Sequence, residues 1–330
     1  MSLERVGVVL IGRNEGARLR EALQSVPPTV GALVYVDSGS SDDSVQVAAG
    51  AGAKVVELDP AAGFTAARGR NEGARWLRAN HPDHEYIQFI DGDCLLVDGW
   101  LVAACERLDR QADVAAVCGA RREQFGDASV FNTICDVEWN QATPGVVHAF
   151  AGDVMIRADV LFEVGGYNEA VIAAEDDELS IRVRAAGHTI ERLDHDMTLH
   201  DVAMTSVRQW WKRAERAGYG YALVNRLHGG PPERYFEPQL RRAVLWGLVA
   251  PLTALGLGRS DKRVTVGVAA LYGLRGIRVA RSRHRAGWRP RVAAAWGVSC
   301  VASSFPQVTG IAKFIIDRLR RRGPEIIEYK

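Results

Sequence analysis

The chain has 330 residues, of which 47% are hydrophobic and 25% are charged, enough to bury one large core or two smaller ones. This composition excludes an intrinsically disordered chain. The five cysteines are scattered without a Cys-x-x-Cys pair, which argues against a disulfide framework and a structural zinc site and fits a reducing cytoplasm. The short N-terminal apolar run does not have the pattern of a signal peptide.

The net charge of +1 conceals two parts of opposite sign. Residues 1–205 hold 17 Lys+Arg against 33 Asp+Glu, whereas residues 206–330 hold 24 against 7. The two parts are therefore expected to have different partners. We expect a catalytic domain over 1–205, a basic helix and linker over 206–240 and an apolar helical region over 241–330.

Short β-branched runs alternate with helical patterns in the first part, which predicts βαβ units and a mostly parallel sheet flanked by helices. The predicted strands are 5–12, 54–58 and 86–93, together with a strand that runs into a loop over 32–40. The predicted helices are 14–26, 41–52 and 65–80. In open α/β sheets, ligands bind beyond the carboxyl ends of strands. The segments "GRNEG", "DSGSSD" and "DGD" lie there, so we expect a binding site at that edge.

Two aspartates, Asp91 and Asp93, close the apolar run "EYIQFIDGDC". Such carboxylates can hold Mg²⁺ or Mn²⁺ while leaving coordination positions for phosphate oxygens. The alternative is a turn with two solvated aspartates. Asp37 ends another strand, where it could accept from a base N–H or a ribose hydroxyl. It could equally form an Asx turn, with Ser40 or Ser41 capping the next helix.

Two further segments add candidate polar groups. "RGRNEG" places Arg70 on the first turns of a helix, where a nucleotide base or diphosphate could be met, unless the arginine is simply solvated. "EDDELSIRVRAAG" (175–187) opens a helix with four acids, which the helix dipole favours. One of these acids could instead take a proton from a sugar hydroxyl.

The second part contains three apolar stretches, 243–258, 264–277 and 292–305, each bordered by arginine or lysine. None reaches the roughly 18 to 20 uninterrupted apolar residues of a bilayer crossing, and the first contains Pro251. They could form a helical subdomain packed on the first part. The basic flanks favour interfacial or re-entrant helices on an anionic membrane surface. Nucleic acid is a poorer fit, because apolar runs separate the basic clusters.

The motif order, strand then "RNEG", "VDSGSSD", "ARGRNEG", "DGD", "GGYNE" and "EDDEL", resembles the inverting glycosyltransferases of family 2, which have the GT-A fold, over about residues 5–205. The resemblance implies that Asp37 contacts the nucleotide base and that Arg70 lies near it. It implies that Asp93 binds the metal, Mn²⁺ or Mg²⁺, directly. Asp91 then binds the ribose or the metal.

The resemblance also implies that Asp176 is the catalytic base and Glu175 its supporting neighbour. His200 resembles a late histidine that some GT-A enzymes use as a third metal ligand; the alternative is a structural histidine. Arg13 stands where many members have an aromatic residue against the base. The remaining residues expected at the nucleotide sugar are Gly12, Arg13, Asn14, Glu15 and Gly152.

The implied reaction moves a sugar from a UDP- or GDP-sugar to an acceptor hydroxyl with inversion. The apolar and basic C-terminal part looks like that of bacterial exopolysaccharide and glycolipid glycosyltransferases. This implies a lipid-linked or saccharide acceptor and a place on the cytoplasmic face of the inner membrane, with no nucleic-acid partner. A sugar nucleotidylyltransferase and a non-catalytic module that binds nucleotide sugars or membranes are the alternative functions.

Overall fold

The computed structural model describes residues 2–320 and divides into two compact units. The first unit comprises Met1–Gln124 and Asp136–Val202, and the second comprises Phe125–Cys135 and Ala203–Lys330. Residues 321–330, the end of the expected membrane-associated region, lie outside the described residues.

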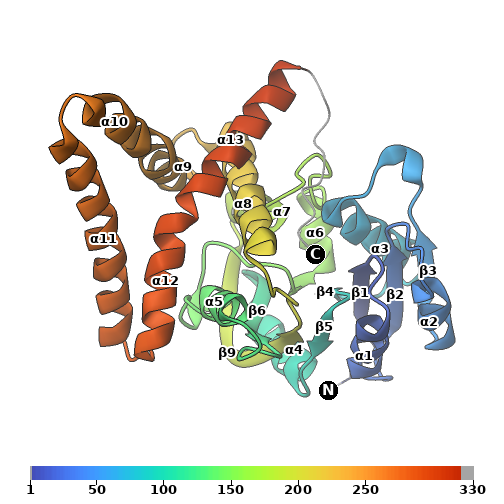
Figure 1. The fold of residues 1–330 in the computed structure, drawn as a ribbon. Helices are drawn as coiled ribbons and strands as arrows, with labels where there is room; N and C mark the ends of the chain where they lie inside the picture. Colours follow the sequence, from blue (N-terminus) through green and yellow to red (C-terminus); the bar gives the residue numbers. More distant parts are fainter. Residues whose placement is uncertain (1, 321–330) are drawn as a thin grey trace. The chain divides into compact units, whose positions relative to one another are not determined.

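The strands of residues 2–320 form one nine-stranded sheet in the first unit, in the order β3-β2-β1-β4-β8-β6-β9-β5 with β7 paired to β9 (Figure 1). The strands are β1 (Val6–Gly12), β2 (Ala32–Asp37), β3 (Lys54–Glu57), β4 (Tyr86–Asp91), β5 (Cys94–Leu96), β6 (Val114–Glu123), β7 (Gly145–Val146), β8 (Val154–Arg157) and β9 (Thr189–His200). The predicted α/β class is confirmed. The sheet is parallel from β3 to β4 and mixed beyond, because β8 joins β4 and β6 in the antiparallel sense.

Strand β1 lies at the centre of the parallel part, between β2 and β4. All its residues except the last are buried, which explains why its sequence, VGVVLIG, is apolar without alternation. Its register pairs Gly12 with Asp37 of β2 and Ile11 with Asp91 of β4. The two aspartates therefore emerge at the same edge of the sheet, on either side of the end of β1.

Helices cover the sheet in the first unit. They are α1 (Ala17–Ser25), α2 (Ser44–Gly50), the short 3₁₀ helix η1 (Pro60–Ala62), α3 (Ala66–Asn80), α4 (Trp100–Arg110), α6 (Ala158–Glu163) and α7 (Glu175–Ala185), while α5 (Val130–Trp139) contains the boundary between the units. A Cβ on Gly73 of α3 would lie 2.4 Å from Val9 Cγ1, so α3 packs on β1 at a distance that only glycine allows. Because Gly69 meets Ile11 and Leu77 meets Gly7, the N-terminus of α3 lies at the carboxyl end of β1.

The second unit contains the helices of the C-terminal part. They are α8 (Val207–His228), α9 (Glu237–Val244), the π-helical η2 (Leu245–Val249), α10 (Ala250–Gly256), η3 (Leu257–Arg259), α11 (Lys262–Arg285), α12 (Pro290–Ala302) and α13 (Ser304–Leu319). Helix α8 begins with a capping box between Ser206 and Gln209. Helices α8 and α13 pack closely, since a Cβ on Gly310 would lie 1.9 Å from the Glu215 carbonyl oxygen. The C-terminal helical region expected from the sequence is present.

The apolar stretch 243–258 is shorter than 18 uninterrupted apolar residues, as expected, but it belongs to a longer helical run. Residues Glu237–Arg259 form a 23-residue helical run with a mean hydropathy of 1.3 in its most apolar window, of which 6% is buried. In length and composition it is the one helix in the described part of the chain that could cross a membrane. Pro251 does not end the run, because it lies in the first turn of α10, directly after the π-helical turns of η2.

Candidate active site

The loop after β2 is organised by Asp37, which is buried. Its carboxylate accepts the N–H groups of Gly39 at 2.9 Å and Ser40 at 2.8 Å, and also the hydroxyl groups of Tyr35 and Ser40. These bonds are those of an Asx-type turn, as one of the two sequence interpretations required. Neither serine caps α2, however, because the N-cap position of α2 is Asp43 and no side chain makes a capping hydrogen bond there.

The loop after β1 is tied to the loop after β2 through Asn14. The Asn14 backbone, in the left-handed region at φ 56°, donates its N–H to Ser40 Oγ at 2.9 Å, and its side-chain oxygen accepts the Ser41 N–H at 2.7 Å. The guanidinium of Arg13 lies 5.6 Å from the ring centre of Phe64. A Cβ on Gly39, at φ 78°, would lie 2.6 Å from the same ring. Phe64 therefore supplies an aromatic surface beside the Asp37 loop, and no sequence motif singled it out.

Asp91 lies between two arginines. Its Oδ1 is 2.8 Å from Arg70 Nη2 and its Oδ2 is 3.1 Å from Arg121 Nη2. Arg121 also pairs with Asp153 at 3.0 Å, and Asp153 accepts the Asp91 backbone N–H at 3.0 Å. The Asp153 carboxylate is completely buried and takes a further hydrogen bond from Thr198 Oγ1. Asp91, which is 27% exposed, is therefore held by ion pairs to Arg70 and Arg121, and its ion pairs argue against a turn with freely solvated aspartates.

Asp93, Cys94 and His200 form a second buried group. Cys94 of β5 is the register partner of His200 in β9, and one potential ligand atom from each of the three residues lies within 4.8 Å of the others. Asp93 Oδ2 is 3.4 Å from His200 Nε2, and His200 Nδ1 is 3.7 Å from Glu123 Oε2. Burial lowers the pKa of His200, which favours the neutral imidazole that binds metals. A carboxylate and a neutral imidazole fit Mn²⁺, and the carboxylate alone also suits Mg²⁺.

Glu175 and Asp176 open α7 beside Arg70. Arg70 Nη1 donates to Glu175 Oε1 at 2.9 Å and lies 3.7 Å from Asp176 Oδ1. Asp176 Oδ2 accepts the Gly152 N–H at 2.7 Å, whereas its buried Oδ1 makes no hydrogen bond within the described residues. Burial raises the pKa of Asp176 to about 7, against the opposing charge of Arg70. A buried carboxylate of this kind has the properties of a general base near neutral pH.

The structure brings five of the sequence-predicted site residues into direct contact or a shared network, namely Arg70, Asp91, Gly152, Glu175 and Asp176. Asp93 and His200 form a pair of their own, while Asp37 and Asn14 share the hydroxyl of Ser40. Gly12 adjoins this group, because a Cβ there would lie 3.2 Å from the Tyr35 hydroxyl. Glu15 pairs with Arg18 at 2.9 Å. The roles of all these residues in binding a ligand remain predictions.

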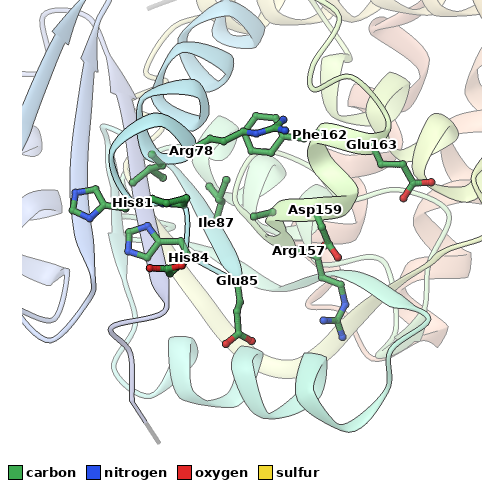
Figure 2. A pocket seen from close by; sticks show the side chains of 13 residues that line it. Arg78, His81, His84, Glu85, Ile87, Arg157, Asp159, Phe162 and Glu163 are labelled. Atoms are coloured by element: carbon green, nitrogen blue, oxygen red, sulfur yellow. The ribbon is translucent and has the colours of Figure 1, made fainter.

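A cavity of about 650 Å³ lies near the start of β4, where Glu85 and Ile87 are part of its lining (Figure 2). Glu85 in its lining directly precedes β4, whereas Asp91 is the last residue of that strand, so the cavity and Asp91 lie at opposite ends of β4. In Figure 2 Arg78 reaches over the ring of Phe162, at 4.4 Å from the ring centre. The cavity has none of the predicted site residues in its lining, and we assign no part of the active site to it.

Comparisons with known proteins bear on this fold and site. The profile of Glycosyl transferase family 2 matches residues 8–160. Proteins of Mycobacterium bovis and Mycobacterium tuberculosis, named as uncharacterized glycosyltransferases, are 32% identical over 201 residues, which are 59% of this chain and 85% of each relative. A glycosyltransferase of Rickettsia felis is 35% identical over 91 residues, 28% of this chain and 29% of that protein.

Two solved structures share the fold at low sequence identity. The mannosyltransferase PcManGT from Pyrobaculum calidifontis, in complex with GDP-Man and Mn²⁺, has a TM-score of 0.59 and 20% identity, covering 92% of this chain and 87% of its own. S. aureus TarS 1–349 has a TM-score of 0.51 and 14% identity, covering 92% and 91%. The family predicted from the motifs is thus confirmed: this chain belongs to glycosyltransferase family 2 and is a glycosyltransferase with the GT-A fold.

Proposed function

We propose that the protein is a metal-dependent inverting glycosyltransferase that moves a sugar from a UDP- or GDP-sugar to an acceptor hydroxyl. The observation that carries this proposal is the joint placement of Asp91 and Asp176 on the single guanidinium of Arg70. A carboxylate from the end of a parallel strand, where donors bind in such sheets, is thereby placed close to a buried carboxylate able to act as a base.

The donor would bind across the carboxyl ends of β1, β2 and β4. Both carboxylate oxygens of Asp37 already accept hydrogen bonds within its own loop, so Asp37 would shape the loop that meets the nucleotide base or the ribose. The Asn14 bonds hold the loops on either side in one arrangement. Arg13 stacks on Phe64, so these two side chains together offer the flat surface that an aromatic residue provides in other family members. Gly12, Glu15 and Gly152 would border the donor rather than recognise it.

A divalent metal would be held by Asp93 and His200, with Asp91 close by. The donor set, a carboxylate and a neutral imidazole, fits Mn²⁺ better than Mg²⁺, and both remain candidates. When bound, the metal would offset the negative charge on the departing nucleotide diphosphate. The chain's own contribution is to keep the Asp93–His200 pair buried and aligned by Glu123.

The transfer itself needs one proton acceptor. Asp176 would take the proton of the acceptor hydroxyl through Oδ1 while that oxygen attacks the anomeric carbon. The bond between this carbon and the diphosphate oxygen breaks on the opposite face, so the configuration inverts and the nucleotide diphosphate leaves with the bonding electrons. The Gly152 N–H fixes Oδ2 at 2.7 Å and so fixes the direction of Oδ1.

The substitution Asp93→Ala tests the metal site. Thermal shift with a panel of UDP- and GDP-sugars, with and without Mn²⁺, should show metal-dependent stabilisation of the wild type that the variant lacks, because only ligands of the native state raise the melting temperature. Asp196→Ala on the same strand as His200 is the control, since Asp196 pairs with Arg122 in an exposed position. Equal donor affinity of Asp93→Ala and the wild type in Mn²⁺ would contradict the assignment.

The second unit would attach the enzyme to the cytoplasmic face of the inner membrane, where a lipid-linked or saccharide acceptor is made. Large apolar side chains are exposed along one stripe of the run from α9 to α10, at Val244, Leu245, Leu248, Val249, Leu252 and Leu255. Exposed apolar residues continue on α11, and arginines border both segments. Apolar stripes with basic ends suit an anionic bilayer surface.

Liposome flotation tests this attachment. The wild type should float with vesicles that contain anionic lipid, and the double variant Leu248→Glu/Leu252→Glu should remain at the bottom of the gradient. Leu227→Glu on α8 is the matched control, because Leu227 is exposed to a similar degree outside the stripe. Flotation that is equal for the double variant and the control would contradict a role for the stripe.

A further inference from the structure

Arg70 occupies a position that its helix and its neighbours fix tightly. It lies in the second turn of α3, directly after Gly69, whose contact with Ile11 places this part of the helix at the carboxyl end of β1. The Arg70 side chain is 3% exposed. Its guanidinium carbon lies 5.3 Å from the ring centre of Tyr167, so an aromatic ring lies beside one side of the group.

The next residue, Asn71, holds the backbone of Tyr167 in place. Asn71 donates from Nδ2 to the Tyr167 carbonyl at 2.8 Å and accepts the Tyr167 N–H at 2.8 Å. The two bonds lock the Tyr167 backbone to α3. A Cβ on Gly166, at φ 71°, would lie 2.7 Å from Asn71 Oδ1, which shows how closely the two segments approach. The guanidinium is therefore held in one orientation before any ligand binds.

Both terminal nitrogens of Arg70 are used by carboxylates. Nη2 reaches Asp91 at 2.8 Å and Nη1 reaches Glu175 at 2.9 Å. A guanidinium engaged in this way is not presented to a nucleotide base. The structure thus favours a different role from the one that the family resemblance implied for this arginine.

Glu175 and Asp176 contact Arg70 in different ways. Glu175 accepts its hydrogen bond, whereas Asp176 Oδ1 stays 3.7 Å away without a hydrogen bond in the described part of the chain. An oxygen that accepted a strong charge-assisted bond would be a weaker proton acceptor. Arg70 can thus fix the start of α7 through Glu175 and leave Asp176 Oδ1 able to receive a proton.

We propose that Arg70 is a positioning residue, which uses Glu175 and Asp91 to fix the base Asp176 relative to the donor side of the site. This role rests on the proposed function, because it needs Asp176 to be the base. Without the guanidinium, three carboxylates would repel one another at the edge of the sheet, and α7 would move away from Asp91. A displacement of about 1 Å at a reacting group can lower turnover by about 10²-fold.

The experiment compares Arg70→Lys and Arg70→Met with the wild type in transfer or donor hydrolysis, and measures donor affinity separately. We expect Arg70→Met to lower kcat by about 10²-fold while the donor Kd changes by less than about threefold. Arg70→Lys should recover part of kcat because it keeps one charge, and added guanidinium ion should raise the kcat of Arg70→Met. The control is Arg75→Met, on the same helix, where Arg75 is 54% exposed and should leave kcat unchanged.

Opposite results would overturn the proposal. If the donor Kd rises in proportion to the loss of kcat/KM while kcat is unchanged, Arg70 binds the nucleotide base and does not position Asp176. If Arg70→Met does not fold, Arg70→Lys and Glu175→Gln test the role instead. Each of these variants should lower kcat while the donor Kd stays constant. An unchanged kcat in both would refute the role. If the wild type has no activity toward any nucleotide sugar, that result contradicts the proposed function itself and not the role of Arg70.

Discussion

Replacing Asp176 with asparagine removes the proposed base and one buried ionisable group, while it keeps an oxygen that can accept the Gly152 N–H. The change is nearly isosteric, so its two effects can be measured separately. General-base catalysis typically contributes about 10²- to 10⁴-fold, and we expect kcat to fall by that factor while donor binding survives. In the wild type, kcat/KM should fall about tenfold for each pH unit below about 7, where Asp176 becomes protonated.

The same substitution should raise stability at alkaline pH. The pKa of Asp176 rises from 3.8 to about 7 on folding, mainly through burial, so the folded state binds the proton more tightly than the unfolded state does. Stability from this group is present in full below pH 3.8 and is lost as the pH rises to about 7. One pKa unit corresponds to about 1.4 kcal/mol, so ionisation of this buried group costs up to about 4 kcal/mol. Asparagine does not titrate and avoids that cost.

The assay is thermal unfolding of both proteins at pH 5 and pH 8, beside steady-state kinetics over the same range. Asp176→Asn should melt several degrees higher than the wild type at pH 8, and the difference should shrink at pH 5. Near wild-type kcat in the variant would refute the base assignment. A melting temperature at pH 8 that does not exceed that of the wild type would refute the argument from burial.

Two further substitutions probe the network around the acids. Gly152→Ala should lower both the melting temperature and kcat, because the glycine has φ 73° and a Cβ would lie 2.0 Å from Arg121 Nη2. The control Gly50→Ala should change neither, because a Cβ there has no neighbour within 4 Å. Equal effects of the two substitutions would contradict the reasoning. Asp153→Ala should lower the free energy of unfolding by about 3–5 kcal/mol in urea, because it leaves Arg121 short of a buried partner. A loss below about 1 kcal/mol would show that the network relaxes.

The sequence was sufficient to locate the strands of the parallel half and the acids at their ends. Apolar runs that stop at Asp37 and Asp91 are local signals, and the parallel register then requires the two residues to emerge at one edge. The acids of "EDDEL" were also found, because four charges at the start of a helix are conspicuous in any sequence.

The residues that pair with those acids could not be predicted from the sequence. Asp153 is 62 residues from the Asp91 N–H that it accepts, and Arg121 lies in β6 among residues that match no motif. Pairing at such separations is set by the order of strands, which composition and periodicity do not encode. The one available signal was the acid in "AGDVMIR", which stands directly before a short apolar run, whereas Asp91 ends one. The two acids lie at the same edge of the sheet because β4 and β8 are antiparallel, and the sequence does not show that direction.

The boundary between the two units has a practical consequence for anyone who wishes to express the catalytic part alone. Phe125–Cys135 belongs to the second unit although both flanking segments belong to the first. Within that segment, the Ser129 hydroxyl donates to the Met204 carbonyl at 2.6 Å. A chain truncated shortly after residue 200 would lose this partner and would separate Phe125–Cys135 from the rest of its unit. Soluble fragments should therefore retain α8, and deletions are better begun in the linker that precedes α9.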